Sequence, residues 1–439
     1  MSSASKQAEA LISKLRGKSS ASRDSVMDEL IEIGPDATEP LMEALDHKDY
    51  KVRMAVAETL GKIGDERAIP PLIDALSDSS KNTQEAAAGA LASIGNAAVP
   101  ALLDALIGSD QAARKWAAEA LGNIGDASVA QELMKRLNDP NIEVQRAAVT
   151  ALGDLKSKRA IEPLIVVLRE DNVDLAKAAA EALGKIRSEI SIEPLIGALE
   201  SPSMDVRKAA GESLQRVGDA AVPGLIEAVR EGDPTMRRWG VEVLGAISDD
   251  RALDLLVEAL EDSDERVVRY AAVALGRLGK ESSIKYLDEL LDHENKDIRY
   301  AAVEGLSGTC SSRAVDSIAK CLEDGDWVVR MTAACGLGEI GSRTCVKPLL
   351  KALEDSEWSV RRHAALSLGR VGIKKRAVEA LVELLSDPKE LVRSAAAEAL
   401  GDLEDEGSIE HIEKLLSDDD PKVVAAAEEA LMKLGVELE

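Results

Sequence analysis

The chain has 439 residues, of which 45% are apolar, yet it contains four Trp, four Tyr and no Phe. Aromatic side chains bury the most area per residue, so a core of Ala, Leu, Ile and Val indicates thin layers of closely spaced helices. The 80 acidic and 54 basic side chains give a net charge of −26, which argues against non-specific binding to nucleic acid or to anionic lipid.

A Leu that is usually followed by Gly recurs every 30 to 32 residues along the chain. It occupies positions Leu30, Leu60, Leu91, Leu121, Leu152, Leu183, Leu214, Leu244, Leu275, Leu306, Leu337, Leu368, Leu400 and Leu431. A fixed period of this length is typical of repeat proteins. The spacing predicts one continuous solenoid over 1–439, with an N-terminal capping repeat over 1–34, internal repeats over 35–404 and an acidic C-terminal capping repeat over 405–439.

Each repeat is predicted to hold two short helices joined by a polar turn. In the third repeat, residues 68–76 have apolar positions at helical spacing and two prolines near the start, where a missing N–H costs little. In the thirteenth repeat, residues 392–401 predict the second helix, which contains the recurrent Leu. A Gly four residues after this Leu in nine repeats predicts a left-handed C-cap. The Gly that directly follows the Leu in nine repeats predicts a neighbouring helix close to the backbone.

Three short motifs recur at fixed places: Pro-Leu in the first helix, Asp in the turn and Val-Arg at the start of the second helix. The twelfth repeat shows all three, in Pro348-Leu349, Asp355 and Arg361, where the Asp precedes the Arg by six positions. These motifs resemble the HEAT-repeat family, in particular its short repeats of about 31 residues known as PBS-lyase-like HEAT repeats.

The resemblance covers the whole chain and implies an all-α fold, a right-handed α-solenoid (superhelix) of about fourteen two-helix repeats. It also implies that the first helices lie on the convex side and the second helices on the concave side. Four repeats replace the motif Arg, so an unbroken Asp–Arg ladder is not expected there. The replacements are Gln84, Gln145, Ala176 and Val268.

Two outward positions of the second helix carry opposite charges. Eight repeats have Glu two residues before the recurrent Leu. Six consecutive repeats have a cation six residues before it: Lys115, Arg146, Lys177, Lys208, Arg238 and Arg269. One interpretation is a set of intrahelical pairs on a solvated face, each worth a few tenths of a kcal/mol. The other is a secondary basic stripe in the groove that binds an acidic partner.

Seven of the eight aromatic side chains lie at outward positions or at the start of the second helix. Trp and Tyr anchor interfaces more often than other residues, so this placement predicts a partner-binding surface along the concave groove. The candidate residues are Trp327, Met331, Cys335, Trp358, Arg362, His363, Leu366, Tyr300, Trp239, Tyr270, Trp116 and Tyr50. The apolar cluster of repeats 11 and 12 is the centre of this surface; the alternative is that its side chains fold back onto neighbouring repeats as extra core.

The four Cys and four His show no metal-binding or catalytic arrangement. Cys310, Cys321 and Cys345 stand where other repeats have Gly or Ala, so they are predicted to be small core residues, and only Cys335 is predicted to reach the groove. The His293-Glu294 pair lies in a turn, unlike the iron-binding pairs of deoxyhypusine hydroxylase, a HEAT-repeat enzyme. A phosphate-binding Gly loop and a nucleophile elbow are also missing from the sequence. No catalytic residue, metal or cofactor is therefore predicted.

The sequence predicts a protein–protein interaction scaffold that binds a partner protein or peptide in the concave groove. The resemblance to bilin lyases, which attach chromophores to phycobiliproteins, leaves a bilin (phycobilisome) lyase-like enzyme or enzyme accessory subunit as the alternative. Nucleic-acid binding in the central basic groove is a third interpretation, against which the charge of −26 and the row of Glu argue. No run of about 18 apolar residues, signal core or disulfide framework is apparent, so a cytoplasmic location without membrane contact is expected. The oligomeric state stays open.

Overall fold

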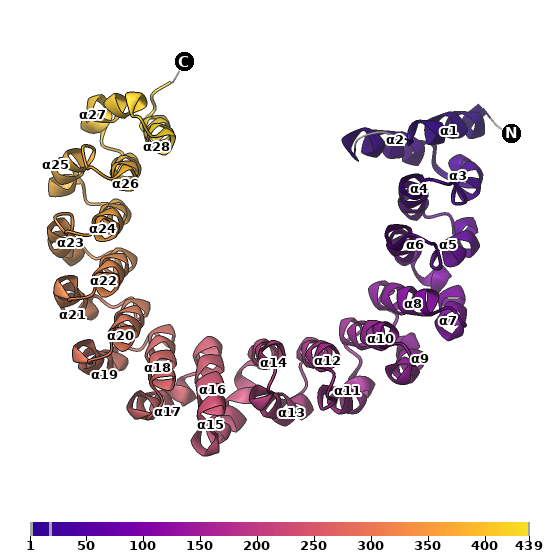
Figure 1. Ribbon diagram of the computed structural model, residues 1–439, viewed down its shortest axis with the longest axis horizontal. Coiled ribbons are helices and arrows are strands. Elements are labelled where there is room, and N and C mark those ends of the chain that lie inside the picture. The colour runs from indigo at the N-terminus through magenta and orange to yellow at the C-terminus, as the bar shows by residue number, and fades with distance from the viewer. Residues whose placement is uncertain (1–2, 17–19, 438–439) are drawn as a thin grey trace. The chain divides into compact units, whose positions relative to one another are not determined.

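The computed structural model describes residues 3–16 and 20–437, and in these ranges the chain is all α, with fourteen pairs of α-helices and no strand (Figure 1). The first helices of the pairs are α1 (Ser3–Lys14), α3 (Thr38–Ala44), α5 (Ile69–Ala75), α7 (Val99–Ile107), α9 (Ala130–Lys135), α11 (Ile161–Leu168), α13 (Ile192–Gly197), α15 (Val222–Glu231), α17 (Leu253–Glu258), α19 (Ile284–Glu289), α21 (Val315–Lys320), α23 (Val346–Ala352), α25 (Lys374–Leu384) and α27 (Ile409–Glu413). The second helices are α2 (Ser20–Ile33), α4 (Tyr50–Ile63), α6 (Lys81–Ile94), α8 (Gln111–Ile124), α10 (Ile142–Asp154), α12 (Val173–Ile186), α14 (Met204–Val217), α16 (Pro234–Ile247), α18 (Glu265–Arg277), α20 (Lys296–Gly308), α22 (Trp327–Ile340), α24 (Trp358–Val371), α26 (Glu390–Asp402) and α28 (Pro421–Lys433). The helices form two compact units, Met1–Gly224 and Leu225–Glu439.

The predicted helices are present, with ends shifted by one or two residues. The helix predicted over 68–76 is α5, which begins at Ile69 after a short 3-10 turn at Glu66–Ala68. The helix predicted over 392–401 is α26, which begins two residues earlier. Many second helices follow an Asp or Asn cap; the Asp326 carboxylate, for example, accepts a hydrogen bond from the Val328 backbone N–H at the start of α22.

Each second helix is followed by a residue with positive φ four positions after the recurrent Leu. Nine of these residues are the predicted glycines, with φ between 64 and 83°. The predicted left-handed C-cap is confirmed at Gly64, Gly125, Gly341 and Gly372. It is wrong at Gly95 and Gly218, whose ψ of −144 and −143° lies outside the left-handed helical region because a 3-10 turn begins there directly. The other five have φ between 49 and 57° and are Lys156, Arg187, Ser248, Cys310 and Glu404. Side chains other than Gly cost about 1–2 kcal/mol in this conformation.

The cysteine predictions are confirmed at two positions and wrong at a third. Cys321 and Cys345 are buried, as expected of small core residues. Cys310 is exposed, because it occupies the left-handed cap position, which lies at the end of the helix rather than on its packed face.

The Gly after the recurrent Leu lies where two second helices approach most closely, which confirms the packing role predicted for it. A Cβ added to Gly122 in α8 would lie 2.8 Å from the Cα of Ala151 in α10. One added to Gly61 in α4 would lie 2.5 Å from the Cα of Ala90 in α6. Both distances are well inside van der Waals contact, so only Gly allows this spacing of the backbones.

Within each unit the second helices pack against one another much more extensively than the first helices do (Figure 1). This holds from α4 to α14 in the first unit and from α16 to α28 in the second. A stack that packs more closely on one side curves toward that side. The second helices therefore line the inner side of each unit.

The helical stretch Lys81–Ile107 is long and apolar enough for a membrane span by length and mean hydropathy alone, and it is the only such candidate in the described ranges. It is not one straight helix, because α6 and α7 are separated by a 3-10 turn at Gly95–Ala98, where Gly95 has a φ of 83°. In this unit α6 packs against α4 and α8, and α7 packs against α8. The stretch is thus a junction between two repeats.

Arginines near the start of seven second helices connect successive repeats as rungs of a ladder. Arg330 is typical: its Nη1 donates to the backbone oxygen of Asp324, six residues earlier, at 2.8 Å. Its Nε and Nη2 donate to the carboxylate of Asp355 in the next repeat at 2.7 and 3.1 Å. The other rungs are Arg53–Asp78, Arg114–Asp139, Arg237–Asp262, Arg299–Asp324, Arg361–Asp387 and Arg393–Asp418. The ladder is interrupted at the four repeats that lack the Arg, as predicted. It is also interrupted at repeat 7, which was not predicted: Arg207 is present and donates to the backbone oxygens of Ser201 and Pro202, but Gly232 stands where the next repeat would supply the Asp.

Candidate functional site

Trp327 and Trp358 are the first residues of α22 and α24, and their side chains are 44% and 36% exposed. The two helices pack against each other in the row of second helices, so the two rings occupy equivalent places one repeat apart. A residue that could bury so much area but leaves over a third of it in water is a candidate contact residue. This exposure agrees with the prediction for both tryptophans, although it does not test their role.

The remaining residues of the cluster in repeats 11 and 12 are neither core nor fully exposed. The half-buried members are Met331, Cys335, Arg362, His363 and Leu366. His363 Nδ1 lies 2.7 Å from the backbone oxygen of Ser359, one turn earlier, and burial raises the pKa of the Cys335 thiol. These side chains present a partly apolar surface beside the two exposed indole rings.

Two other tryptophans are not exposed, so the prediction that Trp116 and Trp239 face a partner is wrong; their exposed fractions are 5% and 6%. Trp116 Nε1 donates to Gln84 Oε1 in the preceding repeat at 2.9 Å, and the Lys115 ammonium lies 4.2 Å from the ring centroid. The Arg238 guanidinium lies 4.9 Å from the Trp239 centroid. A large ring at this register position fills the space between successive second helices and is covered by a cation.

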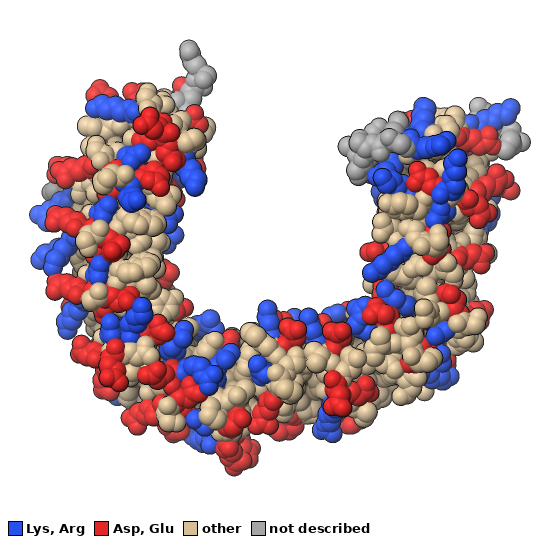
Figure 2. All heavy atoms as spheres, viewed as in Figure 1, with Lys and Arg blue, Asp and Glu red and all other residues tan. Residues whose placement is uncertain are grey.

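The predicted basic stripe consists mostly of local ion pairs. The pairs are Lys115–Glu119, Lys208–Glu212, Arg146–Glu143 and Arg269–Asp297, with N–O distances from 2.7 to 4.0 Å. Arg238 lies over the rings of Trp239 and Tyr270, and Lys177 is exposed. Figure 2 shows basic and acidic side chains interspersed on the visible face of each unit. The intrahelical interpretation therefore holds for Lys115, Lys208 and Arg146, whereas Asp297, the partner of Arg269, lies in the next repeat.

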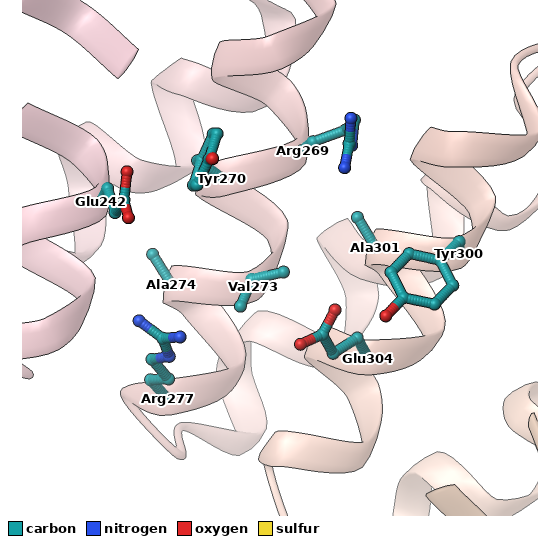
Figure 3. Close-up of a pocket in the computed structure, with 9 residues that line it drawn as sticks. All are labelled: Glu242, Arg269, Tyr270, Val273, Ala274, Arg277, Tyr300, Ala301 and Glu304. Carbon is teal, nitrogen blue, oxygen red and sulfur yellow. The ribbon is translucent and has the colours of Figure 1, made fainter. Parts of the chain in front are cut away.

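A pocket of about 250 Å³ lies among α16, α18 and α20 on the second-helix side of the second unit (Figure 3). Val273, Ala274 and Ala301 give it an apolar lining, and the rings of Tyr270 and Tyr300 border it. Both tyrosines are half-buried, as is Tyr286 in a first helix, whereas Tyr50 at the start of α4 is exposed.

Two carboxylates and two guanidinium groups complete this pocket. Burial raises the pKa of Glu242, an effect that Arg238 and Arg277 oppose, and its Oε2 is buried with no hydrogen-bond partner among the described residues. Burial and the Glu304 carboxylate raise the pKa of the Tyr300 phenol, whose hydroxyl points toward Glu304 in Figure 3. A buried acceptor without a partner favours a ligand group that donates a hydrogen bond.

Sequence reasoning identified Tyr270, Tyr300 and Arg269 in this pocket but missed Glu242 and Arg277. The signal for Glu242 was present, because it belongs to the row of Glu two residues before the recurrent Leu. Neither interpretation of the outward charges predicted a buried carboxylate, whereas the structure half-buries this member.

The thiols are poorly suited to chemistry. Burial raises the pKa of the Cys321 thiol to about 12 and also raises that of Cys345, so both are protonated near neutral pH. Among residues 3–16 and 20–437, no three His, Cys, Asp or Glu side chains gather into a group that could hold a metal ion.

A family model for HEAT repeats matches the chain at residues 8–81, 69–141, 130–215, 192–276, 222–307, 284–346, 315–384 and 346–432, which together span 8–432. The chain belongs to the HEAT-repeat family. A search of curated protein sequences gives no significant match.

Several solved structures share the architecture of this HEAT-repeat chain. Kap95p, in a structure concerned with its binding to RanGDP, matches with a TM-score of 0.66 and 14% identity over 99% of this chain and 66% of its own. The Kap95:Nup1 complex matches with a TM-score of 0.65 and 15% identity over 97% of this chain and 70% of the matched chain. Yeast importin-β (Kap95p) matches with a TM-score of 0.61 and 16% identity over 98% of this chain and 70% of its own. The chain thus spans about two thirds of the length of the first of these. At such low identity the likeness concerns the fold.

Proposed function

We propose that this HEAT-repeat chain is a scaffold that binds a partner protein or peptide on the inner, second-helix side of its second unit. The observation that carries the proposal is the exposure of Trp327 and Trp358 at the starts of adjacent second helices. A chain with only eight aromatic residues leaves two of its four tryptophans accessible at equivalent positions of neighbouring repeats.

The accessible area is large enough to anchor an interface. Each ring exposes roughly 100 Å² of a side chain of about 250 Å², and burying that area contributes about 2–3 kcal/mol at ~25 cal/mol/Å². Binding energy usually concentrates in a few such aromatic residues. Met331 and Leu366 extend the apolar surface, while Arg362 and Tyr300 set the orientation of the partner through polar contacts.

The solved relatives support this kind of function. Kap95p, which shares the fold, is described as binding RanGDP and as forming a complex with Nup1, and both are proteins. A stack of helix pairs supplies a long surface with little need for loops, which suits it to protein partners.

The test is an affinity purification from the native organism, read by mass spectrometry, with the wild type and a Trp327→Ala/Trp358→Ala variant. The matched control is Val166→Ala/Ile190→Ala, which removes two exposed apolar side chains of the first unit, one in α11 and one in the 3-10 turn before α13. We expect the partner to be lost from the tryptophan variant only, with melting temperatures nearly unchanged. Retention of the same proteins by the tryptophan variant, or a large drop in its melting temperature, would show that these rings are not the binding surface.

A further inference from the structure

The four repeats that lack the Arg of the Arg–Asp ladder have a common feature: both members of the rung are replaced. Where the Arg is missing, the residue 25 positions later, which holds the Asp in most intact rungs, is also different. The four replaced pairs are Gln84/Ser109, Gln145/Glu170, Ala176/Ser201 and Val268/His293. Repeat 7 differs from these four, because it keeps Arg207 while Gly232 stands where the Asp would be.

The rung between repeats 6 and 7 is replaced by two small residues, Ala176 and Ser201, and a pocket of about 660 Å³ lies there. In an intact rung the Arg side chain starts from its place on the second helix, and its guanidinium donates to the backbone oxygen six residues earlier and to the Asp of the next repeat. The corresponding residues here are Ala176, Glu170 and Ser201, and all three line this pocket. The repeat 6–7 pocket thus contains the space that the ion pair fills in seven other places.

Part of the wall of the repeat 6–7 pocket is apolar. Its walls include Leu168, Pro194 and Val206. At its mouth lies Val173, the first residue of α12, and this position is apolar and exposed in three consecutive second helices. The three residues are Ile142, Val173 and Met204. An exposed apolar row beside a pocket of this volume is typical of a binding groove.

The charges around the pocket distinguish between possible occupants. Glu170, Asp171 and Glu193 line it together with Arg169. A second cation, Arg207, donates to the backbone oxygens of Ser201 and Pro202 at its edge. Because the lining is acidic in sum, a partner with basic residues beside its apolar ones is favoured over an acidic one.

The spacing of the repeats favours one backbone conformation for a bound peptide. Stacked helices lie about 8–10 Å apart, and a polyproline II helix brings every third side chain to the same face after about 9.3 Å. An extended segment of this kind can place apolar side chains on Ile142, Val173 and Met204 in turn.

We propose that the repeat 6–7 pocket binds a bulky apolar side chain of a partner peptide in the polyproline II conformation, with basic residues flanking the apolar ones. This surface lies in the first unit and is independent of the tryptophan surface in the second unit. It exists because repeat 6 lacks the arginine that would fill it.

The probe is the fluorescein-labelled peptide KKPLPPWPPLPKK, titrated with the full chain and followed by fluorescence anisotropy. Its two comparison peptides have Ala in place of Trp, or Glu in place of all four Lys. We expect each comparison peptide to bind at least tenfold more weakly than the probe. Equal binding of the Trp and Ala peptides, or no binding of the probe up to about 1 mM chain, would overturn the proposal.

The decisive variant restores the rung with Ala176→Arg/Ser201→Asp, and it should weaken probe binding at least tenfold without lowering the melting temperature. Its matched control, Val268→Arg/His293→Asp, introduces the same pair in the second unit and should bind the probe like the wild type. If the restored variant folds poorly, Ala176→Leu fills the pocket without charge and must give the same loss. Trp327→Ala/Trp358→Ala should bind the probe normally, so the result is separate from that of the proposed function. Wild-type affinity in a folded, filled variant contradicts the proposal.

Discussion

The rung between Arg114 and Asp139 gives the sharpest prediction about what holds the stack together. Both groups are buried: Arg114 donates to the Asp139 carboxylate at 2.9 and 3.0 Å, and Asp139 is 3% exposed. Arg114→Met removes the guanidinium and leaves a buried carboxylate that retains only the Asn141 N–H at 3.0 Å and a distant Arg136 at 3.7 Å. Breaking one side of a buried pair costs about 3–5 kcal/mol. The two remaining contacts lower our expectation to about 2–4 kcal/mol.

The pH dependence separates this explanation from a general loss of packing. Burial acts to raise the pKa of Asp139, but the hydrogen bonds of Arg114 and Asn141 outweigh it and hold the pKa below its ordinary value. Without Arg114 burial prevails, so the folded state favours the neutral acid. The destabilisation should then be largest near pH 7 and should decrease as the pH falls towards 5.

The assay is hydrogen exchange of the α8 and α10 amides, because a repeat array can unfold in parts and one global midpoint is not well defined. The control is Arg146→Met, which breaks the exposed pair with Glu143 and should cost less than about 0.5 kcal/mol. Similar losses in both variants, or no recovery on lowering the pH, would refute the reasoning. Adding Asp139→Asn to Arg114→Met should restore much of the protection.

Three further predictions concern the cap and contact positions. Gly122→Ala should destabilise the fold by about 1–3 kcal/mol in a thermal melt, because the added Cβ would lie 2.8 Å from the next second helix. Gly89→Ala, whose Cβ would meet nothing within 4 Å, should stabilise the fold by up to about 1 kcal/mol. Cys310→Gly should raise the melting temperature, since Gly accepts the left-handed conformation at φ 50° without strain; an unchanged or lower value would contradict this. The Arg67 hydrogen bonds lower the pKa of Asp65 to about 2 from 3.8. The ionised Asp65 therefore stabilises the folded state fully above about pH 4, and this stabilisation is lost as the pH falls to 2. An acid titration followed by circular dichroism should show a smaller loss of stability over this range in Arg67→Gln than in the wild type.

Most of the fold could be predicted from the sequence because one period determines it. The recurrent Leu sets the register, and from that register the left-handed cap at Gly64 and the close contact at Gly61 both follow. These features depend on a single repeat and its immediate neighbour. The exposed cap at Cys310 was misread because a cap position was treated as a core position.

The site was predicted less well because helical periodicity describes one helix at a time. Trp116 is on the outward arc of α8, yet Gln84 from the preceding repeat and Lys115 cover it. Whether an outward side chain is exposed depends on how closely the next helix approaches. The burial of Glu242 likewise depends on the neighbouring helices. The pocket at Ala176 is recognised only when the missing Arg is compared with the rungs of other repeats.

The most direct test of the scaffold proposal is site-specific photocrosslinking of the full chain in native extract, with a photoreactive phenylalanine analogue at position 327. A matched chain with the analogue at position 166, an exposed apolar position on a first helix, is the comparison. The proposal predicts that position 327 forms a discrete adduct with a partner protein that is absent from position 166 and is competed by unlabelled wild-type chain. Identical adducts at both positions, or none at position 327, would contradict it.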